Sequence, residues 1–212
     1  SRAGIELMSN VSKILMGSGA VAGGYEIEQS ALFNKSSSPY MVRTPSSTGN
    51  RKTWTLSVWL KKTDISATGN ADSYKYIYGG QASYETTIRF VNNRFDLNQW
   101  TGSATEFSWT TTREFRDTSA WFHLVIAFDS TQGTDTNRIK VYINGVQQAP
   151  TTVAYPSQNL DTRMNLASVP QHIGRYYTTT SGEYLDYNGY MAEFNWLDGT
   201  AAAPSSFGET NS

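Results

Sequence analysis

Acid–base and nucleophilic side chains are sparse in this chain and are not grouped into a recognisable catalytic motif. The only histidines are His123 and His172, and His123 lies in an apolar stretch, where a hydrogen-bonded structural histidine is commoner than a catalytic one. The spacing leaves a Ser-His-Asp triad open, but there is no nucleophile-elbow motif. Glu183 and Asp186 stand three apart in a segment rich in Gly and Tyr, where solvation is their predicted role. The glycine run at 17–24 lacks the lysine of a P-loop. We therefore expect no enzymatic activity.

Aromatic residues give a stronger signal, and it indicates binding. Tyr and Trp combine a ring face with a polar tip, which suits stacking on sugar rings as well as protein interfaces. We expect about half of the loop aromatics to be exposed. Trp59 lies on the polar side of its predicted strand, so it either packs beneath an overlying segment or forms an open stacking platform. The candidate glycan- or partner-binding residues are Trp59, Tyr74, Tyr76, Trp100, Tyr176, Tyr177, Tyr184 and Tyr187.

Composition excludes several classes of function. The 212 residues carry a formal net charge of -1 with no long basic run, so binding of nucleic acid through phosphate neutralisation is not expected. The chain has no cysteine, which rules out disulfides and thiolate metal sites and fits assembly in a reducing cytoplasm. No stretch approaches the ~20 continuous apolar residues of a membrane span. Aromatics at 13% and charged residues at 17% are typical of a β-rich domain with a real core.

The segment at 121–146 is the clearest structural signal. Its first half is an apolar run from Trp121 to Phe128, and Ile139, Val141 and Ile143 then alternate with polar residues. Alternation at period two predicts strands with one buried face, and the pair at 144–145, Asn-Gly, predicts a tight hairpin turn. The pair at 92–93, Asn-Asn, predicts a second hairpin between 86–90 and 94–97, and the segment at 149–170 is expected to be mostly irregular. Similar alternation at 53–60 and 190–196 brings the expected total to about ten to twelve strands. The predicted fold is all-β, an antiparallel β-sandwich of two sheets covering residues 25–212.

The first 24 residues differ from the rest. Ile5, Met8, Val11 and Leu15 recur at the three- and four-residue spacing of a short amphipathic helix, and a small-residue linker follows at 17–24. A helix of about three turns is marginal by itself in water. We therefore expect residues 1–24 to be an anchoring arm, helical or extended, whose apolar stripe is covered by a partner. The alternative is that this arm folds back on its own domain.

Three strings together resemble a laminin-G-like, concanavalin A-like jelly-roll domain: TWTLSVWLKK at 53–62, the hairpin segment at 121–146, and GYMAEFNWLDG at 189–199. The last fits the family's closing-strand pattern except that Ala192 replaces an acidic residue. More narrowly, the stretch at 25–62 and the closing APSSFGETNS resemble units of bacteriophage tail-fibre and head-decoration proteins. The resemblance implies a concanavalin A-like jelly roll, a fold that hosts lectins, glycosidases, adhesion modules and virion proteins.

Two properties of the resembled family bear on chemistry. Its glycosidases carry paired glutamates at an E-x-D-x-x-E spacing, which supplies the two carboxylates of a retaining mechanism; no such string occurs here, and Glu193 is expected to be structural. Some members bind calcium at one rim of the sandwich. Asp129 and Asp135, with Asn137, are the candidate hard-oxygen ligands, and turn formation is the alternative role for them. No other cofactor is expected.

The sequence therefore predicts a non-enzymatic structural protein of a bacteriophage virion, either a capsid decoration or cement protein or a tail-fibre module. It would be anchored by its arm, exposed on the particle surface, and able to adhere to host-surface polysaccharide. Expected partners are other virion proteins and further copies of the chain, in a homo-oligomer such as a trimer. The alternative is a stand-alone carbohydrate-binding, lectin-like module.

Overall fold

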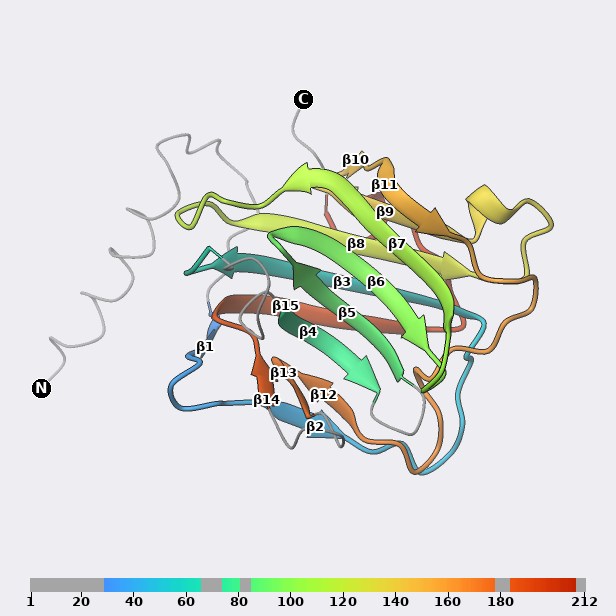
Figure 1. Cartoon of the computed structure of the whole chain (residues 1–212), viewed down its shortest axis with the longest axis horizontal. Helices are drawn as coiled ribbons and strands as arrows, with labels where there is room; N and C mark the ends of the chain where they lie inside the picture. Colours follow the sequence, from blue (N-terminus) through green and yellow to red (C-terminus); the bar gives the residue numbers. More distant parts are fainter. Residues whose placement is uncertain (1–28, 66–73, 81–84, 178–183, 209–212) are drawn as a thin grey trace, which may run out of the picture.

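Alternating apolar and polar residues divide the chain into strands of two sheets, stacked face to face in a computed structural model (Figure 1). The structure describes residues 29–65, 74–80, 85–177 and 184–208, so the predicted arm at 1–24 lies outside the described residues. All strand pairs in this part of the chain are antiparallel. The predicted antiparallel two-sheet β-sandwich is confirmed.

The first sheet has six strands and contains the three strings that carried the sequence prediction. In spatial order its strands are β1 (Ala31–Phe33), β15 (Gly189–Asp198), β3 (Thr53–Lys62), β8 (Phe122–Asp129), β9 (Ile139–Ile143) and β10 (Val146–Gln147). The two strands at its centre, β3 and β8, are buried along most of their length, because other residues cover both of their faces.

The second sheet has seven strands and faces the viewer in Figure 1. In spatial order these are β11 (Pro150–Ala154), β7 (Thr105–Glu114), β6 (Arg94–Trp100), β5 (Glu85–Val91), β4 (Tyr74–Gly80), β12 (Gln171–Ile173) and β2 (Met41–Arg43). A separate two-stranded hairpin joins β13 (Arg175–Tyr177) to β14 (Tyr184–Asp186). Two short 3-10 turns, η2 (Asp135–Asn137) and η3 (Pro204–Ser206), complete the described elements, and no helix among them is long and apolar enough to cross a membrane.

Side chains from the inner faces of both sheets form one core. Trp54 lies at its centre and is fully buried. Its ring stacks between those of Phe128 and Trp196, at centroid distances of 4.9 and 4.8 Å. Aromatic residues from the seven-stranded sheet pack against this stack, including Phe107 at 5.6 Å from Phe128. Burial of rings on this scale is the main favourable contribution to the stability of the sandwich.

Both turns predicted from Asn pairs are present. Asn144 and Gly145 have φ angles of 49° and 78° and connect β9 to β10. Asn92 and Asn93, with φ angles of 49° and 64°, connect β5 to β6. Positive φ at both central positions matches the right-handed twist of the flanking strands. The second turn therefore fixes the register of β5 against β6.

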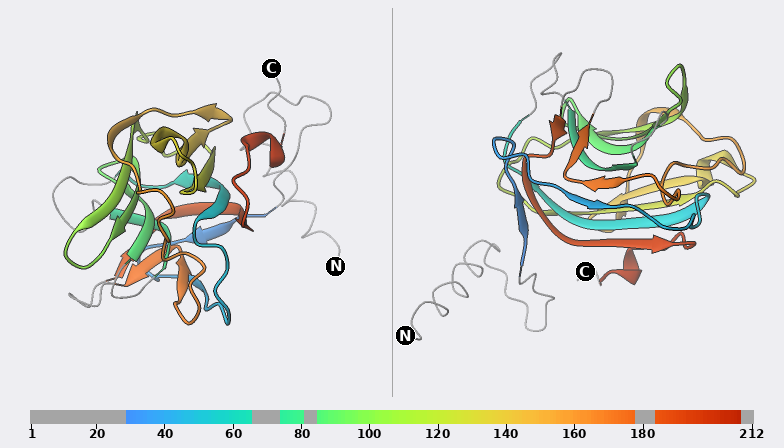
Figure 2. Two further views of the ribbon diagram at one scale, coloured as in Figure 1. Left: turned by 90° about the vertical axis from the view of Figure 1, so that its right-hand side faces the viewer. Right: turned by 90° about the horizontal axis from the view of Figure 1, so that it is seen from below.

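The outer faces of the sheets are only partly open. Residues 199–208 run across the six-stranded sheet (Figure 2, right), where the Thr55 hydroxyl donates to the Thr200 carbonyl at 2.6 Å and accepts from the Ala202 amide at 2.7 Å. The β13–β14 hairpin lies next to β4, and the Gly174 amide before it donates to the Ile77 carbonyl at 2.9 Å. Among the described residues, partly exposed polar side chains remain on the outer face of β6 and β7, namely Asn98, Ser108 and Thr110.

Candidate functional site

A row of four polar side chains crosses the outer face of the seven-stranded sheet, and we call it the front row: Tyr76, Arg89, Asp96 and Thr110. The register places Tyr76 opposite Arg89, Arg89 opposite Asp96, and Asp96 opposite Thr110, so one residue comes from each of β4, β5, β6 and β7. Their neighbours along the strands, such as Ile88, Leu97 and Trp109, point into the core. Period-two alternation therefore places the front row on the opposite face.

Hydrogen bonds join the front row into one network. Arg89 donates from Nη1 to the Tyr76 hydroxyl and from Nε to Asp96 Oδ1, both at 2.7 Å. The Thr110 hydroxyl donates to the other oxygen of Asp96 at 3.0 Å. Both carboxylate oxygens thus accept a hydrogen bond, and the guanidinium is held in a fixed plane. The network is largely buried, with Tyr76 3% and Asp96 7% exposed, so it fixes the positions of the more exposed residues beside it.

Burial and charge set the ionisation of this network. Burial, only partly offset by the neighbouring Arg89, raises the pKa of Tyr76 to about 12, so its hydroxyl keeps its proton. Burial disfavours the charged form of Arg89, but the Tyr76 and Asp96 side chains more than compensate and raise its pKa. The front row is therefore an Arg89–Asp96 ion pair flanked by the neutral hydroxyls of Tyr76 and Thr110.

Two further tyrosines border the front row on the side of β4, next to Tyr76. The Tyr176 ring of the β13–β14 hairpin stacks on Tyr76 at a centroid distance of 4.7 Å and an interplanar angle of 17°. Its hydroxyl donates to a carboxylate oxygen of Glu85, whose pKa is raised chiefly by burial. The Arg89 guanidinium lies over the half-exposed ring of Tyr74, at 5.2 Å from its centroid. Tyr74, Tyr76 and Tyr176 are thus brought together, and they form one wall of the site.

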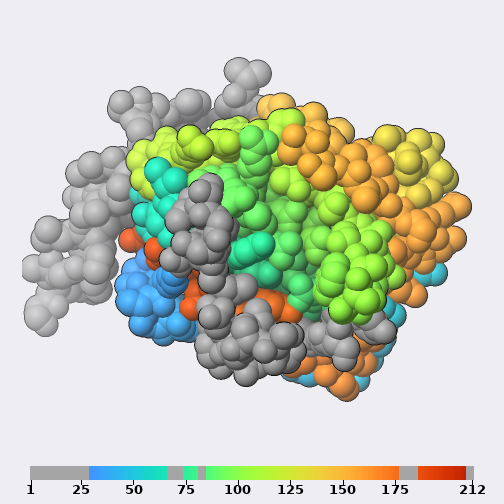
Figure 3. Space-filling model, viewed as in Figure 1, coloured from blue at the N-terminus to red at the C-terminus, as the bar shows by residue number. Residues whose placement is uncertain are grey.

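The floor beside this wall is open and polar. Asn98 and Ser108 lie opposite each other on β6 and β7 and are partly exposed, next to Thr110. Trp100, at the end of β6, is 38% exposed and lies opposite Glu85 on β5. Figure 3 shows this face, with the β5–β7 region (green) at the surface. The floor offers amide and hydroxyl groups between two aromatic borders, Tyr74 at one end and Trp100 at the other.

The carboxylates of this face are too far apart for double displacement at a glycosidic bond. Glu85 is four residues from Arg89 along β5, and Arg89 is opposite Asp96. At the rise of a β-strand this separates Glu85 from Asp96 by about 13 Å along the strands, against about 5 Å for the carboxyl pair of a retaining glycosidase. Both oxygens of Asp96 are also engaged by Arg89 and Thr110. The arrangement is suited to holding a polyhydroxyl ligand.

Trp59 belongs to a different surface, on the outer face of the six-stranded sheet. Its ring stacks on His123 at 4.9 Å and 17°, and Phe207 of the C-terminal segment lies edge-on to His123 at 6.3 Å. His123 Nε2 lies 2.7 Å from the Ser57 hydroxyl. Of the two alternatives for Trp59, packing beside an overlying segment describes its surroundings better than an open platform. The Ser57–His123 pair is buried beneath residues 199–208.

Tyr187 differs from its sequence expectation, because it lies in the core. Its side chain is fully buried and meets Phe33 edge-on at 6.3 Å. It follows β14 directly, and its amide donates to the Gly174 carbonyl at 2.8 Å, which turns the ring inward. A ligand cannot reach it there. Tyr177 and Tyr184 pair with each other in the β13–β14 hairpin, but their side chains lie outside the described part of the structure.

The two candidate calcium ligands act as turn residues. Asp129 accepts from the Thr131 amide at 3.0 Å, the Thr131 hydroxyl at 2.6 Å and the Gln132 amide group at 2.6 Å. Asp135 is exposed in η2 and accepts from the Thr136 amide at 2.7 Å. Within the described residues, no three acidic or imidazole side chains form a group that could hold a metal ion. Calcium binding stays a prediction.

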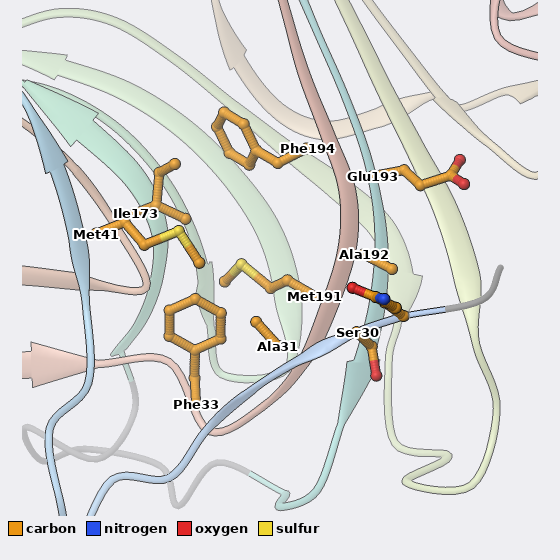
Figure 4. A pocket seen from close by; sticks show the side chains of 10 residues that line it. Ser30, Ala31, Phe33, Met41, Ile173, Met191, Ala192, Glu193 and Phe194 are labelled. Carbon is orange, nitrogen blue, oxygen red and sulfur yellow. The ribbon is translucent and has the colours of Figure 1, made fainter. Parts of the chain in front are cut away.

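Two grooves open at the opposite sides of the sandwich. The first, of about 330 Å³, lies between β1, β15, β12 and β2, where the side chains of Phe33, Met41, Ile173 and Met191 converge while Glu193 points away from them (Figure 4). The second, of about 370 Å³, is more polar and is lined by Trp109, Gln147, Gln148, Pro150, Tyr155 and their neighbours near η2. Neither groove includes a residue of the front row.

The front-row residues Arg89, Asp96 and Thr110 were missing from the sequence-based candidates, although a signal for two of them was present. The Asn92-Asn93 turn, recognised as a hairpin, sets Val91 opposite Arg94 and hence Arg89 opposite Asp96. An arginine opposite an aspartate on the polar side of two apolar strands predicts a cross-strand ion pair. Thr110 had no such signal, because bulges in the pairing of β6 with β7 shift its register.

Comparison with protein-family models identifies the chain. Residues 36–204 match the Laminin_G_3 model of the concanavalin A-like lectin/glucanases superfamily. Since this match covers most of the chain, the protein belongs to that family. No curated protein matches the sequence.

Solved structures with the same fold share little sequence with this chain. Domain 4 of an extracellular GH43 arabinanase from Geobacillus stearothermophilus, solved in complex with arabinotriose, has a TM-score of 0.55 and 14% identity, covering 82% of this chain and 72% of that one. Domains LG4-5 of the mouse laminin alpha1 chain have a TM-score of 0.55 and 12% identity, covering 85% and 43%. The botulinum neurotoxin serotype D binding domain has a TM-score of 0.54 and 12% identity, and the match covers 84% of this chain and 40% of that one. These likenesses show the fold alone.

Proposed function

We propose that this domain is a non-catalytic carbohydrate-binding module that holds a glycan on the open floor beside the front row. The observation that carries the proposal is the hydrogen-bonded network of Tyr76, Arg89, Asp96 and Thr110 across four strands. A sugar ring needs several donors and acceptors held in fixed positions, with an aromatic face close by. Asn98, Ser108 and Trp100 provide both at the surface, and the front row beside them holds the sheet in a fixed geometry.

The absence of catalysis is part of the proposal. The carboxylates Glu85 and Asp96 are separated along the strands, and Asp96 is neutralised by Arg89. Among the described residues, the buried Ser57–His123 pair is covered by the C-terminal segment, so a substrate has no path to the serine. Both arrangements favour retention of a glycan over its cleavage.

The experiment is a glycan-array screen of the purified domain, followed by calorimetric titration of the strongest ligand. Trp100→Ala and Asn98→Ala remove floor groups that are exposed or partly exposed, and each is expected to weaken binding by about tenfold, since one stacking or hydrogen-bonding contact contributes about 1–2 kcal/mol. Lys140→Ala, on the outer side of the other sheet, is the matched control and leaves the affinity unchanged. Binding that survives both floor substitutions, or no saturable binding to any glycan, contradicts the proposal.

A structural role in a bacteriophage virion is the wider context that we propose for this module. A specific feature supports it: large apolar side chains are exposed on and around the two edge strands β1 and β2, namely Leu32, Tyr40, Met41 and Val42, each between 45% and 51% exposed. Gln29 and Ser30, where residues 1–28 join the domain, line the groove between these edges. An apolar edge, together with the apolar stripe predicted for residues 1–24, favours assembly with other copies or other virion proteins.

In this context the module is made in the host cytoplasm, is exposed on the particle surface as a decoration or tail-fibre unit, and presents the front face to host polysaccharide. Light scattering of the chain with and without residues 1–24 tests the assembly step. A trimer that becomes a monomer on truncation supports arm-mediated assembly. A monomer in both forms that also fails to bind particles contradicts it and favours a stand-alone lectin-like module.

A further inference from the structure

Lys62, the last residue of β3, is a lysine enclosed between the two sheets. Its side chain is only 1% exposed, because its inward position on β3 leaves it no route to solvent. Its ammonium nitrogen Nζ donates to the side-chain oxygen Oδ1 of Asn93 at 2.8 Å and to the Phe115 carbonyl at 3.0 Å. Asn93 is itself buried, in the positive-φ turn between β5 and β6.

The surroundings of this amine are apolar. Nζ lies 5.1 Å from the centroid of the Phe90 ring, and Phe90 packs against Phe115 and Phe122 at centroid distances of 5.2 and 6.1 Å. Burial is the main cause that lowers the pKa of Lys62 to about 8, while Asp64 raises it and Lys75 lowers it. A substantial fraction of the amine is therefore neutral at mildly alkaline pH, and a neutral amine is a nucleophile.

A carboxylate lies in the same cluster. Asp64 is two residues beyond Lys62, and its Oδ2 pairs with the buried Lys75 Nζ at 2.9 Å. Its other oxygen, Oδ1, is buried and accepts no hydrogen bond from the described residues. A buried amine and a buried carboxamide thus lie in contact, and the Asp64 carboxylate, whose side chain is 28% exposed, is near enough to affect the amine electrostatically.

We propose that Lys62 and Asn93 join spontaneously in an isopeptide bond that links the two sheets. The Asn93 carbonyl carbon Cγ lies one C=O bond length, about 1.2 Å, from Oδ1, so Nζ is at most about 4 Å from it, close to attack distance. Neutral Nζ attacks Cγ and forms a tetrahedral adduct with the charge on Oδ1. Asp64 takes a proton from Nζ and passes it to Nδ2. The Cγ–Nδ2 bond then breaks, an Nζ–Cγ amide forms, and one ammonia leaves.

The bond would have a mechanical consequence. Lys62 ends β3 of the six-stranded sheet, and Asn93 lies in the turn between β5 and β6 of the seven-stranded sheet. The two residues are 31 apart in sequence. A covalent bridge between the layers closes this loop and restrains the unfolded chain as a disulfide does, in a protein that has no cysteine. It would keep the sandwich closed under pulling forces on the glycan face.

Intact-mass spectrometry of the purified full chain tests the proposal. The expected mass is that of the sequence less one ammonia. Succinimide formation at another asparagine also releases ammonia, so the position is assigned after tryptic digestion. The linked protein yields a branched peptide in which residues 62–75 are joined to residues 90–94, without cleavage after Lys62. Recovery of residues 90–94 as an unmodified linear peptide in nearly all molecules overturns the proposal.

Matched variants separate chemistry from folding. Asn93→Gly and Asn92→Gly both place glycine at a positive-φ position of the same turn, but only Asn93 contacts the amine. Asn93→Gly abolishes the branched peptide and Asn92→Gly retains it, with circular dichroism confirming that both fold. Lys62→Met abolishes the link and Lys61→Met retains it, in a branched peptide that begins at residue 53 because the tryptic site at 61 is lost. Asp64→Asn is expected to leave most molecules unlinked; complete linkage in that variant refutes the proton-relay role of Asp64. Linkage that persists in Asn93→Gly refutes the assigned bond.

Discussion

Removing the carboxylate of Asp96 should destabilise the protein far more than removing an exposed partner of the same kind. Asp96 pairs with Arg89 at 2.7 Å, and their side chains are 9% and 15% exposed. In Asp96→Ala the guanidinium stays charged and buried and keeps the Tyr76 hydroxyl as its only acceptor in the front row. Breaking a buried pair in this way costs about 3 kcal/mol. The comparison in the same sheet is Glu114, whose side chain is 34% exposed and pairs at 2.9 Å with Arg94 and with the more exposed Arg116.

The assay is urea unfolding followed by tryptophan fluorescence. With a urea m-value of about 2 kcal/mol/M, Asp96→Ala should lower the midpoint by about 1.5 M, and Glu114→Ala by less than about 0.5 M because exposed pairs contribute at most about 1 kcal/mol. The double variant Arg89→Met with Asp96→Ala removes the orphaned charge. It should be more stable than Asp96→Ala alone. Equal losses for Asp96→Ala and Glu114→Ala would refute the view that the front row is a desolvated, preorganised network.

Three further predictions follow from the structure. Gly174→Ala should destabilise the domain by about 2 kcal/mol or more, because φ is 85° and the added Cβ would clash with the Phe33 ring. Gly133→Ala is the control and should leave the stability unchanged, since the space around Gly133 is open. Equal urea midpoints for the two variants would contradict this prediction. Burial lowers the pKa values of His123 and His172. Below about pH 6.5 the unfolded chain therefore binds more protons than the folded one, and the free energy of unfolding decreases as the pH is lowered. A variant with glutamine at both positions should lose less stability between pH 7 and 5, and a slope equal to that of the wild type would contradict this. Tyr74→Ala should weaken glycan binding severalfold through loss of the wall beside Arg89, while Tyr142→Ala on the opposite sheet should not; equal affinities in calorimetry would exclude Tyr74 from the site.

The fold was predictable because its signals are local. Period-two alternation at 53–60 and 139–143 and the apolar run at 121–128 mark strands of the six-stranded sheet, and the Asn-Gly and Asn-Asn pairs mark hairpin turns. The segment after residue 149 was expected to be mostly irregular, and it instead begins with β11, which pairs with β7. Because β11 lies exposed at the edge of the sheet, its sequence shows little of the alternation of apolar and polar residues on which the strand prediction depends.

The candidate site was only partly predictable, because a loop tyrosine and a core tyrosine look alike in sequence. Tyr176 and Tyr187 both lie near the β13–β14 hairpin, yet one stacks on Tyr76 at the front face and the other fills the core. The difference arises from Gly174, which holds the hairpin against β4 through backbone hydrogen bonds. The Lys62–Asn93 contact joins residues from different sheets, and no local pattern encodes such a pairing.

The most direct test of the central claim is a map of where a glycan binds. Amide and side-chain NMR shifts should be recorded while the strongest ligand of the array is titrated into the isotope-labelled domain. The account predicts saturable changes at Asn98, the Trp100 indole, the Arg89 Nε–H and Thr110, with the six-stranded sheet unaffected. Changes confined to the groove at β1 and β2, or to the surface around Trp59, would contradict the assignment of the front face as the glycan-binding site.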